Sequence, residues 1–301
     1  MNSELKTKNA PKGSTSGPLQ RMQDLLAAHG VKPRKFLGQN FLIDPNFALA
    51  VAHAAAPDER TLLVEVGPGT GILTRALLDS HPRARVLAIE IDRRLCGLLR
   101  EELASEIAAG RVTLLEGDVL ASKHRINAEL LAAGLRISRQ EERPRRVLCA
   151  NLPYHVATPV IANLALELVP FVERIVATVQ LELAQRFFGA PGTSEFGPLA
   201  VLLALRARGS IVRRVGPQVF WPRPRVSSAV VELDLIPWEA CALKPERAAA
   251  FQALVQKLFQ QRRKTLRAVL KGRLRADDPR AILRAEDLPP EELLKLLADL
   301  E

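Results

Sequence analysis

The segment TLLVEVGPGTGI at residues 61–72 decides the fold of this 301-residue chain. Its first six residues predict a buried strand; Gly67, Gly69 and Gly71 follow at once, and a helical pattern starts at Ile72. Such a strand–glycine turn–helix unit binds nucleotides in open α/β sheets, because glycine lets the backbone approach a ligand at the helix N-terminus. A dinucleotide fingerprint needs a small residue where Ile72 stands, so the spacing favours a ligand without pyrophosphate, such as S-adenosylmethionine (SAM).

On both sides of this unit, apolar strands alternate with amphipathic helices. Because helices separate most of these strands, the pattern predicts an α/β fold with a Rossmann-like, mostly parallel seven-stranded sheet and helices on both faces. The last two strands have no clear helix between them and are expected to form an antiparallel pair at one edge. The further predicted strands are 84–90, 111–116, 146–150, 174–180, 210–215 and 227–235.

Outside the sheet, we expect a helix at 122–135 and an exposed basic loop at 136–145. After Pro237 only helical patterns occur, and this change predicts a small C-terminal helical subdomain. The expected C-terminal helices are 246–271, 279–285 and 290–300. The expected parts of the chain are a flexible basic tail at 1–18, a SAM-binding catalytic domain at 19–236 and the helical subdomain at 237–301.

The charge of the chain is unevenly distributed. There are 43 Lys+Arg against 33 Asp+Glu, a formal net charge of +10. Separated basic blocks on an acidic remainder are typical of a surface that binds phosphates, although ordinary solvated surface is the alternative for any one block. The blocks are 1–35 (+5), 136–150 (+3), 206–225 (+6) and 257–280 (+7), against −11 for the rest.

Composition also excludes several classes of protein. With 48% hydrophobic residues the chain can form a core, and no apolar run approaches the roughly 20 residues that span a bilayer. The N-terminus lacks the apolar region of a secretory signal. Cys96, Cys149 and Cys241 show no metal-ligand spacing, and the five His residues form no cluster. We therefore expect no metal and a reducing, cytoplasmic location.

Acidic residues follow two further strands of the predicted sheet. Glu90 closes the second strand, where a carboxylate can accept hydrogen bonds from both ribose hydroxyls of an adenosyl group. Asp118 follows the third strand and can accept from the adenine amine, with a capping role as the alternative. The carboxyl ends of parallel strands meet at one edge, so these acids and the loop glycines Gly67 and Gly69 are predicted to form one cofactor site.

The fourth strand ends in Asn151-Leu152-Pro153-Tyr154. This pattern suits methyl transfer to a planar exocyclic nitrogen, whose lone pair is delocalised into the ring. The Asn151 side-chain oxygen and the Leu152 carbonyl can accept from the two N–H groups and favour a pyramidal nitrogen. Pro153 makes the turn rigid, and Tyr154 is expected to stack on the base. An ordinary Asn-Pro turn is the alternative.

A base must leave its stack to reach such a pocket. Phe220, in a loop stiffened by Pro222 and Pro224, is the candidate for a second aromatic face, with a core role as the alternative. Arg223 and Arg225 flank it and are candidates for RNA contacts. Further RNA contacts are predicted from the basic run Arg262-Arg263-Lys264, for which a packed structural helix is the alternative.

With these residues assembled, the chain closely resembles the small-subunit (16S) ribosomal RNA adenine-N6,N6-dimethyltransferases, the KsgA/RsmA family. The resemblance extends from about Lys35 to Leu288, and the combination of motifs is far more specific than any one of them. The motifs are LGQNFL (37–42), VEVGPGTGILT (64–74), NLPY (151–154), FGPLAV (196–201), FWPRPRVSSAVV (220–231), FQQRRKTLRAVL (259–270) and RAEDL (284–288).

The resemblance implies a class I methyltransferase fold and SAM as the donor. It implies two methyl transfers to N6 of each of two adjacent adenosines in the 3′-terminal hairpin loop of small-subunit rRNA. By position, Asn40 and Leu42 line the cofactor site, and Asn151 contacts both cofactor and substrate. Tyr154 and Phe220 clamp the adenine. The implied partner is the assembling 30S particle. The enzyme is expected to bind it as a monomer without membrane attachment. The C-terminal subdomain is expected to contribute to RNA binding.

Four other functions share part of this pattern. A 23S rRNA adenine methyltransferase of the antibiotic-resistance type has the same chemistry, but Leu152, Gly38 and the run 262–265 favour the small-subunit enzyme. A transcription-factor-like binding protein on the same fold is disfavoured by the intact NLPY and Glu90. A DNA adenine methyltransferase lacks support because no target-recognition domain is evident. A dehydrogenase conflicts with the glycine spacing.

Overall fold

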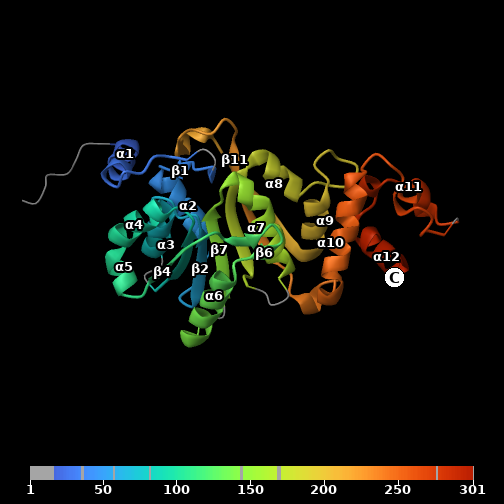
Figure 1. Ribbon diagram of the computed structural model, residues 1–301, viewed down its shortest axis with the longest axis horizontal. Helices are drawn as coiled ribbons and strands as arrows, with labels where there is room; N and C mark the ends of the chain where they lie inside the picture. The colour runs from blue at the N-terminus through green and yellow to red at the C-terminus, as the bar shows by residue number, and fades with distance from the viewer. Residues whose placement is uncertain are drawn as a thin grey trace, which may run out of the picture.

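The computed structural model describes residues 17–300 apart from 35–36, 57, 81–82, 143–144, 168–170 and 276. A central sheet carries helices on both faces, and a group of helices forms the C-terminal end of the molecule (Figure 1). The expected flexible tail at 1–18 lies outside the described residues except for Gly17 and Pro18. Helix α1 (Pro18–Ala28) begins at that proline.

The main sheet has seven strands in the order β4-β3-β2-β7-β8-β11-β9. The first five run parallel, whereas β11 is antiparallel to both of its neighbours. The predicted Rossmann-like, mostly parallel seven-stranded sheet is confirmed, with its antiparallel pair at one edge. The strands are β2 (Thr61–Val66), β3 (Arg85–Glu90), β4 (Val112–Glu116), β7 (Arg145–Asn151), β8 (Arg174–Gln180), β9 (Ala207–Val215) and β11 (Ser228–Leu235).

Both faces of the sheet are buried under helices. Along β2, Leu63 joins the hydrophobic cluster on one face, whereas Leu62 and Val64 join the cluster on the other. Successive side chains of a strand point to opposite faces, so a strand covered on both sides is apolar along its whole length. The first face carries α2 (Pro45–Ala54), α3 (Ile72–Ser80), α4 (Arg93–Glu102) and α5 (Ala104–Ala108); the second carries α6 (Ala128–Gln140), α7 (Tyr154–Leu166) and α8 (Leu181–Phe187).

The segment between β4 and β7 differs from the prediction. A helix was expected at 122–135, but its first residues form a hairpin of β5 (Leu120–Ser122) and β6 (Arg125–Ile126), and the helix begins only after it. The expected basic loop at 136–145 is wrong for its first half, because α6 continues to Gln140.

Helix α6 has both a clear start and a polar outer face. The Asn127 side chain accepts hydrogen bonds from the backbone N–H groups of Glu129 and Leu130, which fixes its first turn. Arg136 and Arg139 lie on the exposed side. The charges that suggested a loop are therefore the solvated face of an amphipathic helix.

The C-terminal helices follow β11, and the single helix expected at 246–271 is wrong. It is divided into α10 (Pro245–Gln260) and α11 (Leu266–Leu270). Between them Thr265 forms an isolated antiparallel β-bridge with Arg284, and this long-range pairing interrupts the helix. The other elements of this part are the 3-10 helices η3 (Trp238–Ala240), η4 (Pro279–Ile282) and η5 (Ala285–Asp287) and helix α12 (Pro290–Leu300).

The C-terminal helices share a hydrophobic cluster with helix α9 (Pro198–Arg206), which precedes β9. In Figure 1 α9 lies beside α10, between the sheet and the helices at the C-terminal end. The guanidinium of Arg206 lies 3.5 Å from the centre of the Trp238 ring, and Arg206 also donates to the Ile236 carbonyl. This buried contact joins the two parts of the chain, whose division at 236–237 stays a prediction. Within the described ranges, no helix has the length and apolar composition needed to cross a membrane.

Candidate active site

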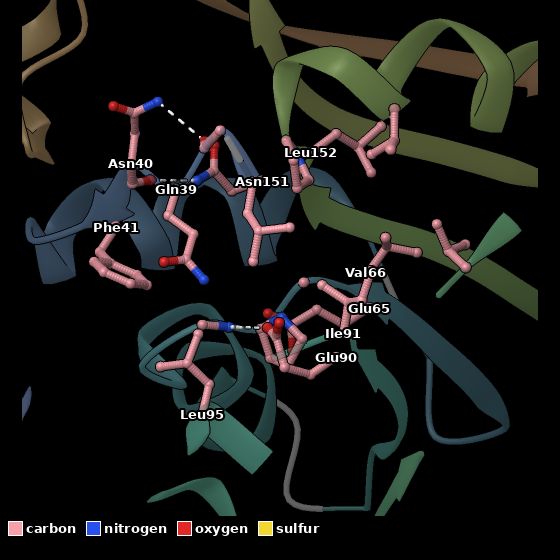
Figure 2. A pocket seen from close by; sticks show the side chains of 18 of the residues that line it. Gln39, Asn40, Phe41, Glu65, Val66, Glu90, Ile91, Leu95, Asn151 and Leu152 are labelled. Atoms are coloured by element: carbon pink, nitrogen blue, oxygen red, sulfur yellow. Dashed lines mark hydrogen bonds between the residues drawn. The ribbon is translucent and has the colours of Figure 1, made fainter. Parts of the chain in front are cut away.

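A cavity opens at the carboxyl ends of the parallel strands, next to the glycine loop (Figure 2). Every residue predicted for catalysis or cofactor binding lines it, although these residues come from six separate segments of the chain. They are Asn40, Leu42, Gly67, Gly69, Glu90, Asp118, Asn151, Leu152, Pro153, Tyr154 and Phe220. Among the residues that the structure describes, no group of three or more His, Cys, Asp or Glu side chains is placed to hold a metal ion.

The glycine loop can adopt its path only because side chains are absent. Gly67 and Gly69 have φ angles of +67° and +60°, in the left-handed region that favours glycine. A Cβ atom at Gly69 would lie 3.1 Å from the Phe41 ring, and one at Gly67 would lie 3.5 Å from the Pro153 ring. The loop is thus packed closely between the 37–42 segment and the NLPY turn.

Glu90 ties this loop to the start of α4. Its carboxylate accepts hydrogen bonds from the backbone N–H groups of Gly69 (3.1 Å) and Asp92 (2.9 Å). Burial raises the pKa of Glu90, and the two N–H donors oppose that shift. Each carboxylate oxygen has a further lone pair, so both oxygens can still accept a hydroxyl of a bound ligand. The structure therefore fits the predicted contact with a ribose.

Asp118 and Gln39 also belong to the cavity wall. Asp118 is exposed, and one of its oxygens accepts from the backbone N–H of Leu120 at 2.9 Å, so it stabilises the turn after β4 as well as lining the cavity. The Gln39 side chain donates to Asp92 at 3.2 Å. Gln39 was not assigned a role from the sequence, and only its position inside the LGQNFL motif could have indicated one.

Glu65 also lines the cavity, close to Glu90 (Figure 2), although no motif of the sequence singled it out. Its side chain is 1% exposed, and burial raises its pKa to about 8, helped by the nearby Glu90 charge. The Thr74 hydroxyl donates a hydrogen bond of 2.6 Å to the carboxyl group. The sequence did contain a signal for a functional role of Glu65, because an acidic residue interrupts the apolar strand TLLVEV.

Asn151 is held in a defined orientation at the end of β7. Its side-chain N–H group donates to the backbone carbonyl of Asn40 at 3.3 Å, a contact drawn in Figure 2. This bond uses the nitrogen end of the amide and leaves the oxygen end as an acceptor. The following backbone is fixed as well, because the N–H of Leu152 donates to the Thr178 carbonyl at 3.2 Å.

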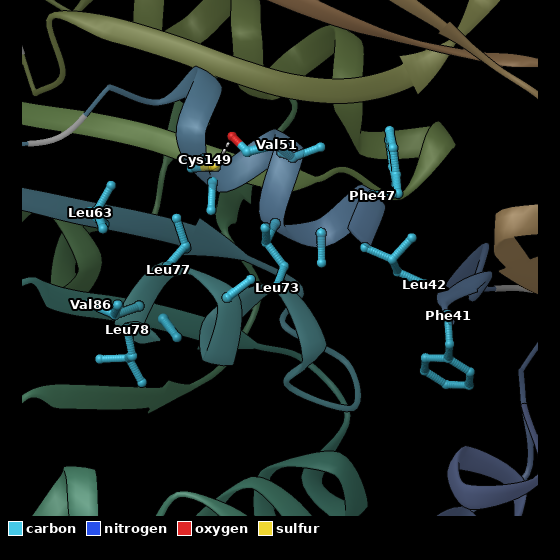
Figure 3. Packing of buried hydrophobic residues seen from close by; sticks show 14 of the residues in the cluster. Phe41, Leu42, Phe47, Val51, Leu63, Leu73, Leu77, Leu78, Val86 and Cys149 are labelled. Atoms are coloured by element: carbon cyan, nitrogen blue, oxygen red, sulfur yellow. Dashed lines mark hydrogen bonds between the residues drawn. The ribbon is translucent and has the colours of Figure 1, made fainter. Parts of the chain in front are cut away.

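The 37–42 segment reaches the cavity through a pairing that the sequence did not predict. Strand β1 (Phe41–Leu42) pairs antiparallel with β10 (Phe220–Trp221), which follows the 3-10 helix η2 (Pro217–Val219). Leu42 is buried with Phe47 in the cluster on the first face (Figure 3). This two-stranded sheet therefore brings Asn40, Leu42 and Phe220 to one wall of the cavity.

Phe220 lies in this wall but is largely buried. It is 3% exposed and contacts Phe47 edge to face, with ring centres 6.4 Å apart. Its packing makes it part of the core and its position makes it part of the cavity lining. The expected stacking on adenine stays a prediction.

Tyr154 begins α7 and is anchored by a residue of β11. Its hydroxyl lies 3.1 Å from the hydroxyl of Ser228, the first residue of β11. Ser228 is fully buried and pairs with Gln180 on one side and Val215 on the other, so its position is fixed by two neighbouring strands. The hydrogen bond thus orients the Tyr154 ring at the cavity.

Replacing Ser228 with Ala is expected to raise the pKa of Tyr154. Burial already raises this pKa, and the hydrogen bond from Ser228 lowers it. Tyr154 is the single tyrosine of the chain, so 13C-labelled tyrosine gives one NMR signal whose titration reports this group. The matched control is Ser227→Ala at the exposed neighbouring serine. Equal titration curves for the two variants would contradict the contact.

The predicted RNA-binding residues differ in their surroundings. Arg223, Arg225, Arg263 and Lys264 are exposed. The Arg262 guanidinium, in contrast, pairs with Glu286 and donates to the carbonyls of Thr193 (2.7 Å) and Ser194 (3.1 Å). Arg262 therefore joins two segments of the C-terminal part to the loop before α9, in agreement with the structural alternative for that residue. Its contact with RNA stays a prediction.

The seven-stranded sheet, the glycine loop at its carboxyl edge and the acids beyond it define a Rossmann-like SAM-dependent methyltransferase. The fold is similar to that of a dimethyladenosine transferase from Plasmodium falciparum, with a TM-score of 0.63 and 22% identity over 86% of this chain and 96% of that one. It is also similar to the 23S rRNA methyltransferase ErmE, with a TM-score of 0.59 and 23% identity over 87% and 99% of the two chains. Likenesses at this identity concern the fold alone.

The family is set by sequence. The profile of the ribosomal RNA adenine dimethylase family matches residues 30–292, and the chain belongs to that family. It is 38% identical to the ribosomal RNA small subunit methyltransferase A of Rhodospirillum rubrum, covering 91% of this chain and 90% of the relative. It is 40% identical to the protein of the same name from Leifsonia xyli, covering 84% of each. Membership makes the chain a SAM-dependent ribosomal RNA adenine dimethyltransferase.

Proposed function

We propose that this enzyme dimethylates N6 of two adjacent adenosines in the 3′-terminal hairpin loop of small-subunit rRNA, during biogenesis of that subunit. The relatives that match over most of their length carry the name small subunit methyltransferase A. The observation that carries the chemistry is the Asn151 amide, which is held by Asn40 at the end of β7 beside the glycine loop. Because its substrate is ribosomal, we expect the enzyme to act in the cytoplasm. We also expect it to act as a monomer.

SAM fits the half of the cavity nearest the glycine loop. The loop backbone approaches closely because Gly67 and Gly69 carry no side chains, and buried Glu90 keeps lone pairs for the ribose hydroxyls. Asp118, which also lines the cavity, can accept from the adenine amine of the cofactor, and Asn40 and Leu42 complete the lining. When bound, SAM supplies an electrophilic methyl group on its sulfonium.

The other half of the cavity, around NLPY, suits the target adenine. The Asn151 oxygen and the Leu152 carbonyl accept hydrogen bonds from the N6 amino group, which favours a pyramidal nitrogen with its lone pair directed toward the methyl group. A strong base is not needed before transfer, because the methylated nitrogen is strongly acidic. The contribution of the protein is therefore orientation and electrostatics.

The aromatic side chains suit a base that has left its stack. Tyr154 offers a ring face whose direction is set by the bond to Ser228, and Phe220 offers a second apolar surface. A flipped adenine placed between them loses its stacking in the RNA and gains stacking on protein, which lowers the cost of extrusion.

The identity of the substrate can be tested with tritiated SAM and ribosomal particles that lack the modification. We expect label to enter 16S rRNA of 30S particles and not 23S rRNA of 50S particles. Digestion of the labelled RNA should yield dimethyladenosine from two adjacent positions. Label that enters only the large subunit would identify a 23S enzyme, the specificity named for one of the similar folds. Absence of label from both would overturn the proposal.

A further inference from the structure

Strand β9 forms an open edge of the main sheet. It is the last strand in the order and pairs only with β11, so its outer row of backbone N–H and C=O groups has no neighbouring strand in the described part of the chain. Arg208, Arg213 and Arg214 lie along this strand, and all three are exposed. We call these three residues the β9 arginines.

The β9 arginines have no acidic partner in the part of the chain that the structure describes. Within the described residues, none of them has an ion pair or a side-chain hydrogen bond, and no Asp or Glu occurs from 196 to 231. The nearest acids on β11 are already engaged, because Arg174 pairs with Glu232 at 2.6 Å and with Asp234 at 2.8 Å. Asp234 lies opposite Arg208 in register, whereas Arg213 and Arg214 lie opposite the apolar residues Val230 and Ala229. The uncompensated positive charge of this edge is therefore concentrated at Arg213 and Arg214.

The position of β9 relates this charge to the active site. β9 is antiparallel to β11, which is antiparallel to β8, so the C-terminal end of β9 lies at the same edge of the sheet as the end of β7. Three strand spacings separate β9 from β7, roughly 14 Å. Arg213 and Arg214 lie at this end of β9, and Arg208 lies roughly 20 Å from Arg214 along the strand.

The strand also fixes the directions of the side chains. Arg213 pairs in register with Val230 and Arg214 with Ala229, and these two residues of β11 belong to the clusters on opposite faces. The two arginines therefore project on either side of the sheet edge. A rigid edge with cations on both sides and roughly 20 Å long can follow several successive phosphates of a nucleic-acid backbone.

From this geometry we infer that the β9 edge is a second RNA-binding surface, which holds the phosphate backbone of a double-helical segment beside the target loop. This inference rests on the proposed function, in which the target adenosines lie in a hairpin loop and a stem therefore lies next to the occupied cavity. Double-stranded RNA is recognised through its backbone and shape, which suits arginines spaced along one edge strand. The surface is distinct from the cavity that receives the base.

Charged residues on an edge strand can also have another purpose, since they prevent two sheets from pairing edge to edge. The two purposes respond differently to charge reversal. Glutamate protects an edge as well as arginine does, but it repels phosphate. Arg213→Glu/Arg214→Glu therefore separates RNA binding from edge protection, and Arg213→Lys/Arg214→Lys preserves both.

The experiment measures binding of the full-length enzyme to unmodified 30S particles and to a 20-base-pair RNA duplex at several salt concentrations. We expect the Glu variant to bind both RNAs at least about tenfold more weakly at 50 mM salt, with a salt slope reduced by about two. The Lys variant should bind like the wild type. The matched control is Arg136→Glu/Arg139→Glu on the exposed face of α6, which makes the same change in net charge.

Each outcome decides the inference. Equal weakening by the α6 control would show that net charge alone is responsible and would overturn it. Unchanged binding by the Glu variant, or weakened binding to the 30S particles but not to the duplex, would overturn it as well. Failure of the proposed function is recognised separately, because the wild-type enzyme would then transfer no methyl groups to the same 30S particles.

Discussion

Asn151→Ala is expected to lower the rate of methyl transfer by about 10²–10³-fold, the typical effect of removing one preorganised hydrogen bond from a reacting group. The alanine variant loses the acceptor for the N6 amino group and the bond to the Asn40 carbonyl. Because the lone pair of the amine is then no longer directed, the loss should appear in kcat under saturating SAM and RNA. Single-turnover transfer to unmodified 30S particles measures it directly.

A structural effect of this substitution can be separated from a chemical one. Asn163 is buried, lies on α7, and donates its side-chain N–H to the Lys123 carbonyl at 3.2 Å. It does not line the cavity, so Asn163→Ala should cost stability without a comparable loss of rate. If Asn151→Ala turned over as fast as the wild type, the assignment of the catalytic site would be wrong.

The second large effect concerns Glu65 and the pH dependence of stability. The folded-state pKa of about 8 lies above the usual value of 4.5, so between these pH values the folded protein binds more protons than the unfolded chain. Stability from this group is thus fully present below about pH 4.5 and declines as pH rises to about 8. The total decline is roughly 3–5 kcal/mol.

Glu65→Gln should remove most of this decline. Glutamine has nearly the same shape, still accepts from the Thr74 hydroxyl, and carries no charge that burial can penalise. Urea unfolding at pH 5, 6, 7 and 8 measures the slope for both proteins. An exposed glutamate changed in the same way, Glu239→Gln, is the matched control and should follow the wild type. An unchanged slope in Glu65→Gln would show that other groups cause the dependence.

Much of the fold is readable from local patterns. The run from Thr61 to Ile72 contains a strand, a glycine turn and a helix start within twelve residues, and each depends on neighbours in the chain. The same holds for the Asp92 cap of α4, whose side chain accepts from the N–H of Arg94. Such elements are predictable because the interactions that form them span only a few residues.

One predicted element was wrong because two distant segments of the chain meet there. The helix expected at 246–271 is interrupted because Thr265 pairs with Arg284, a contact that no local pattern contains. A second predicted element was wrong because a run of charged residues does not by itself distinguish an exposed loop from the exposed face of a helix. The arginines of 136–145 suggested a loop, although Arg136 and Arg139 lie on the solvated face of α6.

The cavity shows the same division. Its chemical groups stand in short motifs, so the sequence by itself determined the class of fold, the glycine loop and the NLPY turn. The tertiary structure decided how these groups are held: Asn40 against Asn151, Ser228 against Tyr154, and β1 against β10. It also decided which charges stay free, since Arg262 is engaged by Glu286 whereas the β9 arginines are not. The physical reason is that motifs specify local conformation and chemistry, whereas hydrogen bonds and ion pairs between segments depend on how the sheet brings those segments together.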